Sequence, residues 1–225
     1  APTVQLRWVS PGDSLGTPDA VVIPGSKQTL RDLASLRRTG LDAALVDFAM
    51  QGGEVFGICG GMQMMGESLQ DPDGLEGEPH SNTPSGHEPG LALLPIRTVF
   101  GGAKALRQRQ SPALWPPQMP PLRLEGFELH RGLTDVCGDC TPLCGDEELG
   151  WIKHHNGQAG AAAGTYLHGI FDNGAWRRRW LNRLRRRRDL PELNEDQPHH
   201  SRQREALLDR LADAFEQHVN LDPLL

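Results

Sequence analysis

The sequence is poor in cysteine and contains no long apolar run. Four cysteines among 225 residues are too few for a disulfide scaffold, so we expect a protein of the reducing cytoplasm. No stretch reaches the length of a membrane-spanning helix, and the first residues do not have the pattern of a signal peptide. The composition therefore argues against a small secreted scaffold and predicts no membrane partner.

An excess of positive charge is also lacking. The formal net charge is −6, with 23 basic against 29 acidic side chains, which gives no overall attraction to nucleic acid. The phosphate-binding pattern G-x-x-x-x-G-K-[ST] is absent, so we expect no ATP or other cofactor on this chain. The chain does not begin with Met, and we expect it to continue a longer gene product.

The chain does show alternating strand and helix signals. Apolar runs at 4–9, 19–24 and 54–58 predict strands, and the helical spacing of apolar residues from Leu41 to Ala49 predicts a helix. Alternation of this kind predicts an α/β fold with a flavodoxin-like, mainly parallel sheet and helices on both faces. The length suits one domain covering 1–225. Sites in such folds lie at the carboxyl ends of the strands.

The rest of the chain is less regular. We predict loops at 71–90, 112–121 (anchored by Trp115) and 133–150, strands at 91–100, 124–130 and 161–167, and amphipathic helices marked by Trp176 to Leu184 and by Leu208 to Val219.

A cysteine occupies the sharpest predicted turn. Cys59 follows the strand at 54–58 and is flanked by Gly57, Gly60 and Gly61, a pattern typical of a nucleophile elbow between a strand and a helix. A nucleophilic thiol needs a base, and His168 follows a predicted strand late in the chain. Acyl transfer by such a pair is the chemical prediction. The alternative is a buried structural cysteine in a glycine-rich turn.

Four motifs in a fixed order identify a resemblance. They are Pro24-Gly25-Ser26-Lys27-Gln28-Thr29, Gly57-Ile58-Cys59-Gly60-Gly61-Met62-Gln63-Met64-Met65-Gly66, Gly126-Phe127-Glu128-Leu129-His130 and Gly164-Thr165-Tyr166-Leu167-His168-Gly169-Ile170-Phe171-Asp172-Asn173. Together they resemble the glutamine amidotransferase domain of cobyric acid synthases. The resemblance implies a class I glutamine amidotransferase fold at the carboxy-terminal end of a longer enzyme.

The resemblance also implies a reaction and partners. An amino-terminal synthase domain would use ATP and Mg²⁺ to activate carboxylates of a corrinoid, adenosylcobyrinic acid diamide. This chain would hydrolyse glutamine through a thioester on Cys59, with His168 as base, and supply ammonia. The backbone N–H of Gly60 and the Gly25-Ser26 loop are candidates for holding the oxyanion. By resemblance, Gln63 would contact glutamine; the alternative is an exposed polar residue on a helix.

The base lacks an evident orienting carboxylate. Many class I glutaminases carry His-x-Glu, whereas Ile170 stands at that position here. The cobyric acid synthase type also has His-Gly at this point. We therefore expect His168 to be held by a backbone carbonyl or by a neighbour, with Glu128 and His130 as candidates. The alternative for both is an ordinary polar strand face.

Two further groupings favour structural interpretations. The first is a set of possible zinc ligands: Cys137, Cys140 and Cys144, followed by His154-His155. One pair has the C-x₂-C spacing of a zinc site, but the second such pair that structural zinc sites usually have is absent, so we predict no metal site. Eight arginines among the twelve residues Arg177–Arg188 share a helix with apolar side chains. We interpret them as a solvated face or a docking surface for the synthase domain rather than a nucleic-acid site.

Three other functions remain open from the sequence. One is an amidotransferase for another acceptor, either cobyrinic acid diamide or a cell-wall lipid precursor. Another is a catalytically silent domain that only docks the synthase domain, although it would not need both Cys59 and His168. The last is a cysteine peptidase or hydrolase with the same elbow. Incubation with glutamine and with peptides would separate them.

Overall fold

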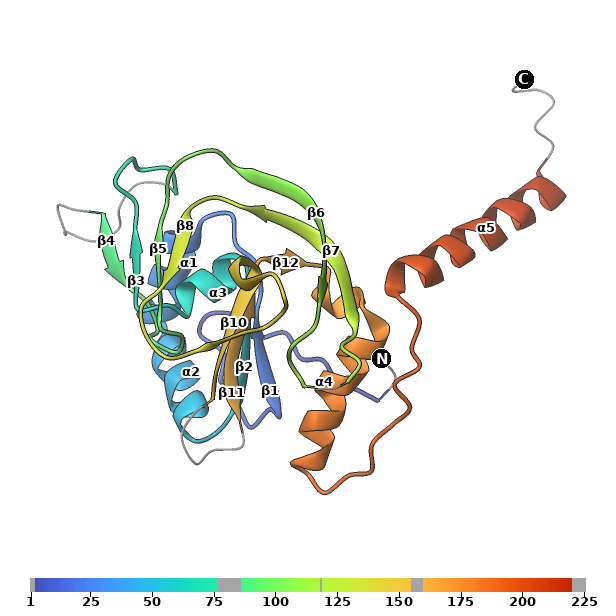
Figure 1. Ribbon diagram of the computed structural model, residues 1–225, viewed down its shortest axis with the longest axis horizontal. Coiled ribbons are helices and arrows are strands. Elements are labelled where there is room, and N and C mark those ends of the chain that lie inside the picture. Colours follow the sequence, from blue (N-terminus) through green and yellow to red (C-terminus); the bar gives the residue numbers. More distant parts are fainter. Residues whose placement is uncertain (1–2, 77–85, 118, 155–159, 220–225) are drawn as a thin grey trace. The chain divides into compact units, whose positions relative to one another are not determined.

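A computed structural model of the protein describes residues 3–76, 86–117, 119–154 and 160–219 (Figure 1). The chain divides into two compact units, Ala1–His168 and Gly169–Leu225, and each is described by itself. The prediction of one glutaminase-type domain over 1–225 stays a prediction. Within the described ranges, no helix is both long enough and apolar enough to cross a membrane.

The first unit is built on a five-stranded sheet with the order β1-β2-β11-β10-β9. Strand β2 (Glu54–Ile58) pairs in parallel with β1 (Ala20–Ile23) on one side and with β11 (Ala161–Thr165) on the other. Strands β10 (Gly150–His154) and β9 (Thr141–Pro142) continue the sheet with antiparallel pairings. The predicted α/β class is confirmed, with a mixed rather than purely parallel sheet.

Three helices accompany this sheet in the first unit. They are α1 (Thr29–Arg38), α2 (Leu41–Met50) and the short α3 (Gly60–Met64), which starts directly after β2. Strand β11 consists of small residues because α3 packs closely on it: a Cβ on Gly164 would overlap the side chain of Met62. This close packing brings the start of α3 to the carboxyl ends of β2 and β11.

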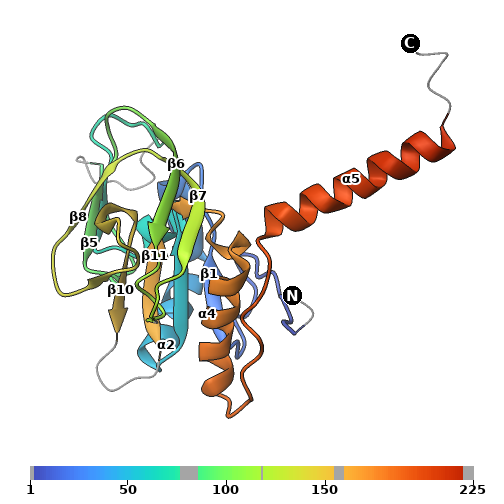
Figure 2. The ribbon, with the colours of Figure 1, turned by 45° about the vertical axis from the view of Figure 1, so that its right-hand side comes forward.

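Two smaller sheets complete the first unit. One has the order β4-β3-β5-β8, formed by β4 (His87–Pro89), β3 (Ser68–Gln70), β5 (Ile96–Val99) and β8 (Leu133–Val136). The other has the order β12-β7-β6, in which the long strands β6 (Ala105–Pro112) and β7 (Arg123–His130) form a hairpin and β12 (Leu167–His168) pairs with β7. Both ribbon views show β6 and β7 side by side (Figures 1 and 2). A short 3₁₀ helix, η1 (Glu147–Leu149), precedes β10.

The second unit contains η2 (Ile170–Asp172), α4 (Gly174–Arg186) and α5 (His200–His218). Phe171 packs edge-on against Trp176 and Trp180, with ring centroids 5.5 and 5.2 Å apart. The expected solvated arginine face is wrong for Arg178 and Arg179, which are buried. The reason at Arg179 is a pair of hydrogen bonds to Glu195, 3.0 and 2.9 Å long, which compensate for the buried charge.

Several predictions of single elements are corrected. Residues 4–9 form no strand: the apolar side chains alternate as expected, but Leu6 and Trp8 are 71% and 82% exposed. The predicted loop at 133–150 contains β8 and β9, and the predicted irregular stretch at 112–121 begins inside β6. The expected anchor in that stretch is confirmed, since Trp115 is buried and stacks on Phe56 at 6.5 Å between ring centroids.

Candidate active site

The predicted elbow is present at the end of β2. Cys59 has φ +50° and ψ −113°, a backbone conformation that residues other than glycine rarely adopt. The glycines around it give the space this turn needs: a Cβ on Gly61 would overlap the carbonyl of Ile23, and one on Gly57 would lie 2.6 Å from the backbone of Met62. The strained turn directs the Cys59 side chain away from the sheet at the start of α3.

The structure brings Cys59 and His168 to the same place, beside Gly25. A Cβ on Gly25 would lie 3.7 Å from Cβ of Cys59 and 3.5 Å from Cε1 of His168. The lack of a side chain at Gly25 therefore leaves room between the thiol and the imidazole. Three segments far apart in the sequence, at the ends of β1, β2 and β12, meet at this point.

One backbone N–H bonds the thiol, and a second backbone nitrogen lies beside the same residue. The N–H of Gly60 donates to the Cys59 sulfur. A Cβ on Gly60 would lie 2.9 Å from the backbone nitrogen of Ser26 and 3.0 Å from Oγ1 of Thr29, so the Gly25-Ser26 loop is close to Gly60. The Ser26 hydroxyl is engaged elsewhere, where it donates to Asp32 and accepts from the N–H of Gln28.

One carbonyl oxygen holds both candidate catalytic side chains. Sγ of Cys59 donates to the Leu129 carbonyl oxygen over 3.4 Å, and Nε2 of His168 donates to the same oxygen over 3.1 Å. The His168 ring also stacks on Phe127, with ring centroids 5.0 Å apart and an angle of 10° between the rings. Two residues of the Gly126–His130 motif in β7 thus fix the imidazole, Leu129 through its backbone oxygen and Phe127 through its aromatic face.

Burial keeps both side chains neutral. It raises the pKa of the Cys59 thiol to about 11; the Gly60 N–H opposes this shift, while Glu76 adds to it and Lys104 reduces it. Burial also lowers the pKa of His168, against the effect of the Leu129 carbonyl, and the nearby His130 lowers it further. A neutral imidazole can accept a proton at neutral pH.

The two candidate orienting residues point to other partners. Oε1 of Glu128 bonds Nε2 of His130 over 2.9 Å, and Oε2 lies 3.3 Å from Nε of Arg109. The His130 ring stacks on Tyr166 at 3.6 Å between centroids. Of the two holders expected for His168, the backbone carbonyl is the one observed. The buried Glu128 thus joins the half-buried His130 to Arg109.

Gln63 lies in a buried network rather than on an exposed helix face. It is 2% exposed, and its Nε2 donates to the carbonyl of Arg131 over 3.1 Å and to the Tyr166 hydroxyl over 3.0 Å. The Tyr166 hydroxyl also bonds Thr134 over 2.6 Å. Contact of Gln63 with a substrate stays a prediction.

A family model supports the chemistry expected of this site. The model of the CobB/CobQ-like glutamine amidotransferase domain matches residues 1–176. The chain belongs to this family. The matched range includes the elbow at Cys59 and the imidazole at His168, so both lie within the amidotransferase domain.

Curated relatives of this amidotransferase domain are longer proteins. The chain is 66% identical over 224 residues to a cobyric acid synthase of Synechococcus sp. (strain WH7803), covering 100% of this chain and 45% of that protein. It is 54% identical over 228 residues to a cobyric acid synthase of Prochlorococcus marinus (strain MIT 9313), covering 100% of this chain and 44% of that protein. The chain thus spans a little under half the length of these relatives.

A solved structure supports the fold of the domain. The structure of PurLQS from Thermotoga maritima superposes with a TM-score of 0.51 at 14% identity, over 73% of this chain and 74% of that one. At this identity the likeness concerns the fold alone.

Residues outside the predicted site also lie close to it. Sequence analysis missed Leu129, because only its backbone oxygen takes part, and Phe127, which appeared as an ordinary strand residue. It also missed Glu76, which was assigned to a loop although its carboxylate bonds the N–H of Thr29 over 2.8 Å. The turn sequence Asp71-Pro72-Asp73-Gly74 before Glu76 was the available signal.

The cysteine loop of the amidotransferase domain has no assigned role. It contains three free thiols, those of Cys137, Cys140 and Cys144. Burial has the largest effect on their pKa values and raises each of them. Within the described ranges, no three metal-binding side chains cluster; His155 lies outside them. The absence of a metal site stays a prediction that metal analysis of the purified protein can test.

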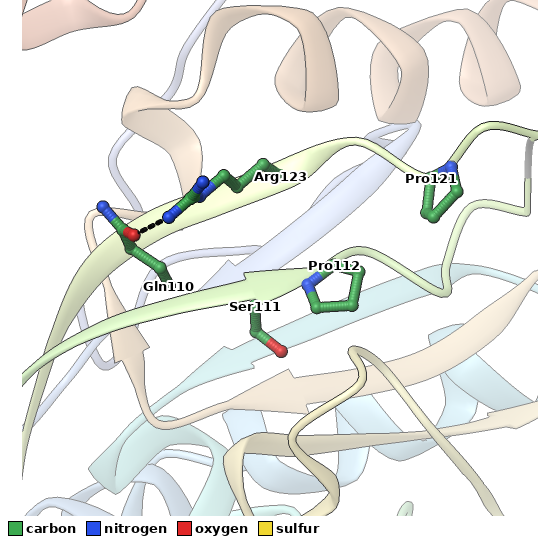
Figure 3. Close-up of a pocket in the computed structure, with 5 residues that line it drawn as sticks. All are labelled: Gln110, Ser111, Pro112, Pro121 and Arg123. Carbon is green, nitrogen blue, oxygen red and sulfur yellow. Dashed lines mark hydrogen bonds between the residues drawn. The ribbon is translucent and has the colours of Figure 1, made fainter.

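A surface pocket of about 320 Å³ lies away from the thiol (Figure 3). It is lined by residues of the β6–β7 hairpin, with Gln110 and Arg123 bonded to each other and Ser111 beside Pro112. Leu124, opposite Ser111, is about 16 Å along β7 from Leu129 at the usual strand rise. The Ser111 hydroxyl in this pocket accepts from the N–H of Asp146 over 2.9 Å, whereas Cys59 has an imidazole beside it, so we place the chemistry at Cys59.

Proposed function

We propose that this domain hydrolyses glutamine to glutamate and ammonia. Cys59 Sγ attacks the side-chain amide carbon, the C–N bond breaks, and the proton received by His168 passes to the departing ammonia. Water then cleaves the thioester on Cys59, which releases glutamate and restores the thiol. The observation that supports this proposal best is the strained Cys59 elbow beside His168 at Gly25.

The oxyanion of each tetrahedral intermediate is assigned to two backbone donors. They are the N–H of Gly60, which bonds the thiol, and the N–H of Ser26, whose nitrogen lies close to Gly60. Donors held in place before the reaction stabilise developing negative charge more effectively than water does. Gly25 leaves space for the substrate amide. Gln63, which lies in α3 directly after the elbow, is proposed to contact glutamine.

Before proton transfer, the Cys59 thiol must leave the Leu129 carbonyl. In the structure, Nε2 of His168 donates to this oxygen and therefore carries a proton, so the lone pair of the neutral ring lies on Nδ1. A turn of the imidazole, or movement of its proton from Nε2 to Nδ1, brings a lone pair to the thiol proton. Glu128 and His130, on the opposite face of β7, are proposed to position this segment.

For the whole protein we propose glutamine-dependent cobyric acid synthesis in the cytoplasm. The identity to cobyric acid synthases over 100% of the chain supports this proposal. An amino-terminal domain would bind ATP and Mg²⁺ and activate carboxylates of adenosylcobyrinic acid diamide. Ammonia from Cys59 would then amidate them.

The test separates the two half-reactions in the full-length enzyme. Cys59→Ala should abolish glutamine-dependent amidation, because the thioester cannot form. Amidation with ammonium salts should continue at a normal rate, since activation of the acceptor occurs elsewhere. Near-normal turnover of glutamine by Cys59→Ala would show that another group is the nucleophile.

A further inference from the structure

A carboxylate lies next to the donors assigned to the oxyanion. Oε2 of Glu76 accepts a hydrogen bond of 2.8 Å from the N–H of Thr29, the first residue of α1. Oγ1 of Thr29 lies 3.0 Å from the position that a Cβ on Gly60 would take, and the nitrogen of Ser26 lies 2.9 Å from it. Glu76 is therefore separated from both donors by the single residue Thr29.

Hydrogen bonds within its own loop fix the position of Glu76. The two carboxylate oxygens of the buried Asp71 accept from the N–H groups of Leu75 and Glu76, each over 2.8 Å. The N–H of Asp71 donates to the carbonyl of Gly86 over 2.8 Å. Gly86 has φ +56°, and a Cβ there would lie 2.5 Å from the Asp71 oxygen, so this contact requires glycine.

The negative charge of Glu76 opposes the chemistry proposed for Cys59. A carboxylate near a thiol favours its protonated form, and Glu76 raises the pKa of Cys59 in addition to the larger effect of burial. It would also repel an oxyanion at Gly60 and Ser26. The bond to Thr29 does not require this charge, because an uncharged acceptor can also cap a helix N-terminus, although the dipole of α1 modestly favours a carboxylate there. A cation in the substrate would offset the unfavourable effect of this charge on the thiol and the oxyanion.

We propose that Glu76 binds the α-ammonium group of glutamine and selects glutamine over amides that lack this group. The inference rests on the proposed glutaminase function. With the amide carbon at Cys59, the ammonium nitrogen is four bonds away, or about 5 Å at bond lengths near 1.5 Å. Its charge would neutralise Glu76, so binding of the correct substrate also favours ionisation of the nucleophile.

The test compares glutamine with glutaramate, the same amide without the α-amino group, in the full-length enzyme with ammonia release as the readout. Glu76→Gln keeps an acceptor for the Thr29 N–H but removes the charge. We expect it to lower kcat/KM for glutamine by about 10- to 100-fold and to leave kcat/KM for glutaramate unchanged or higher, because the charge that opposes ionisation of Cys59 is removed. Glu147→Gln, which removes an exposed carboxylate in η1, should change neither value.

Three results would overturn the proposal. The first is an equal loss of kcat/KM for both amides in Glu76→Gln, which would leave Glu76 as a structural cap of α1. The second is an unchanged kcat/KM for glutamine in that variant. The third is an equal kcat/KM for the two amides in the unmodified enzyme, a measurement that tests the proposal even if Glu76→Gln fails to fold. An unmodified enzyme that hydrolyses neither amide would instead contradict the proposed glutaminase function.

Discussion

At the scale of single residues, the Leu129 carbonyl determines how the two candidate catalytic groups are held. It accepts hydrogen bonds from both the Cys59 thiol and Nε2 of His168. Each group therefore carries its proton. Ionisation of the pair requires that the thiol loses its bond to this oxygen, whereas a protonated imidazole can keep donating to it from Nε2.

The first prediction concerns the pH dependence of Cys59. Because its pKa is raised from 9.0 to about 11, alkylation of Cys59 by iodoacetamide should be slow at neutral pH and should rise about tenfold per pH unit towards pH 11. Between these two values the unfolded thiol loses its proton while the folded one keeps it. Stability should therefore fall as pH rises through this window.

Peptide mass spectrometry can follow alkylation of Cys59 separately from the other cysteines, and Cys59→Ala should remove its share of the alkaline destabilisation. A rate of alkylation that already levels off near neutral pH would contradict the raised pKa.

A second prediction concerns His168 as the base. His168→Ala should reduce glutamine-dependent turnover by at least the roughly 10²–10⁴-fold typical of general acid–base catalysis, since it also reduces the thiolate. His168→Asn offers a matched control, because an amide can donate to Leu129 but cannot take up the thiol proton. Turnover of His168→Asn near the wild-type rate would identify another residue as the base.

At the scale of elements, β7 organises the site from both of its faces. Alternate residues of a strand point to opposite faces. Phe127 stacks on His168, whereas Glu128 and His130 bond each other. Strand β12 carries His168 and pairs with β7 at Phe127 and Glu128. The position of the imidazole therefore depends on close contact between these two strands.

Gly126 provides that close contact and gives a third prediction. A Cβ at this position would overlap the carbonyl of His168, so Gly126→Ala should push β12 away from β7. We expect a stability loss of about 1–3 kcal/mol and a fall in glutamine turnover. Gly101→Ala is the control, because a Cβ there meets nothing within 4 Å. Thermal unfolding and glutamate release would measure both effects, and equal behaviour of the two variants would argue against the role of Gly126.

Sequence patterns predicted the elements whose side chains have a regular environment. Strand β2 was found because it is apolar and buried, and β7 because polar and apolar residues alternate. Strand β6 was missed because it is mostly polar and exposed, and residues 4–9 were wrongly assigned because alternation alone does not supply a pairing strand. Cys59 and His168 could be proposed from side-chain chemistry. The Leu129 carbonyl could not, since every residue has a backbone oxygen.

At the scale of the whole molecule, the chain spans 45% of the cobyric acid synthase of Synechococcus sp. (strain WH7803). A glutaminase with neutral catalytic groups suits an enzyme that releases ammonia only when an acceptor is activated. We therefore predict that the full-length enzyme hydrolyses glutamine slowly by itself. Addition of ATP, Mg²⁺ and the corrinoid acceptor should raise glutamate release by at least about tenfold.

Glutamate release measured with and without the acceptor checks this coupling, and Cys59→Ala should release none in either case. Full activity with glutamine alone would show that the site is complete without the acceptor reaction.

The protonated state of Cys59 also has a consequence for oxidative damage. Peroxide and disulfides react with thiolates far faster than with thiols, and a buried thiol is further protected. A nucleophile with a pKa of about 11 is therefore slow to form a sulfenic acid until substrate binding ionises it. The same burial that slows the enzyme without its substrates protects its nucleophile from oxidation.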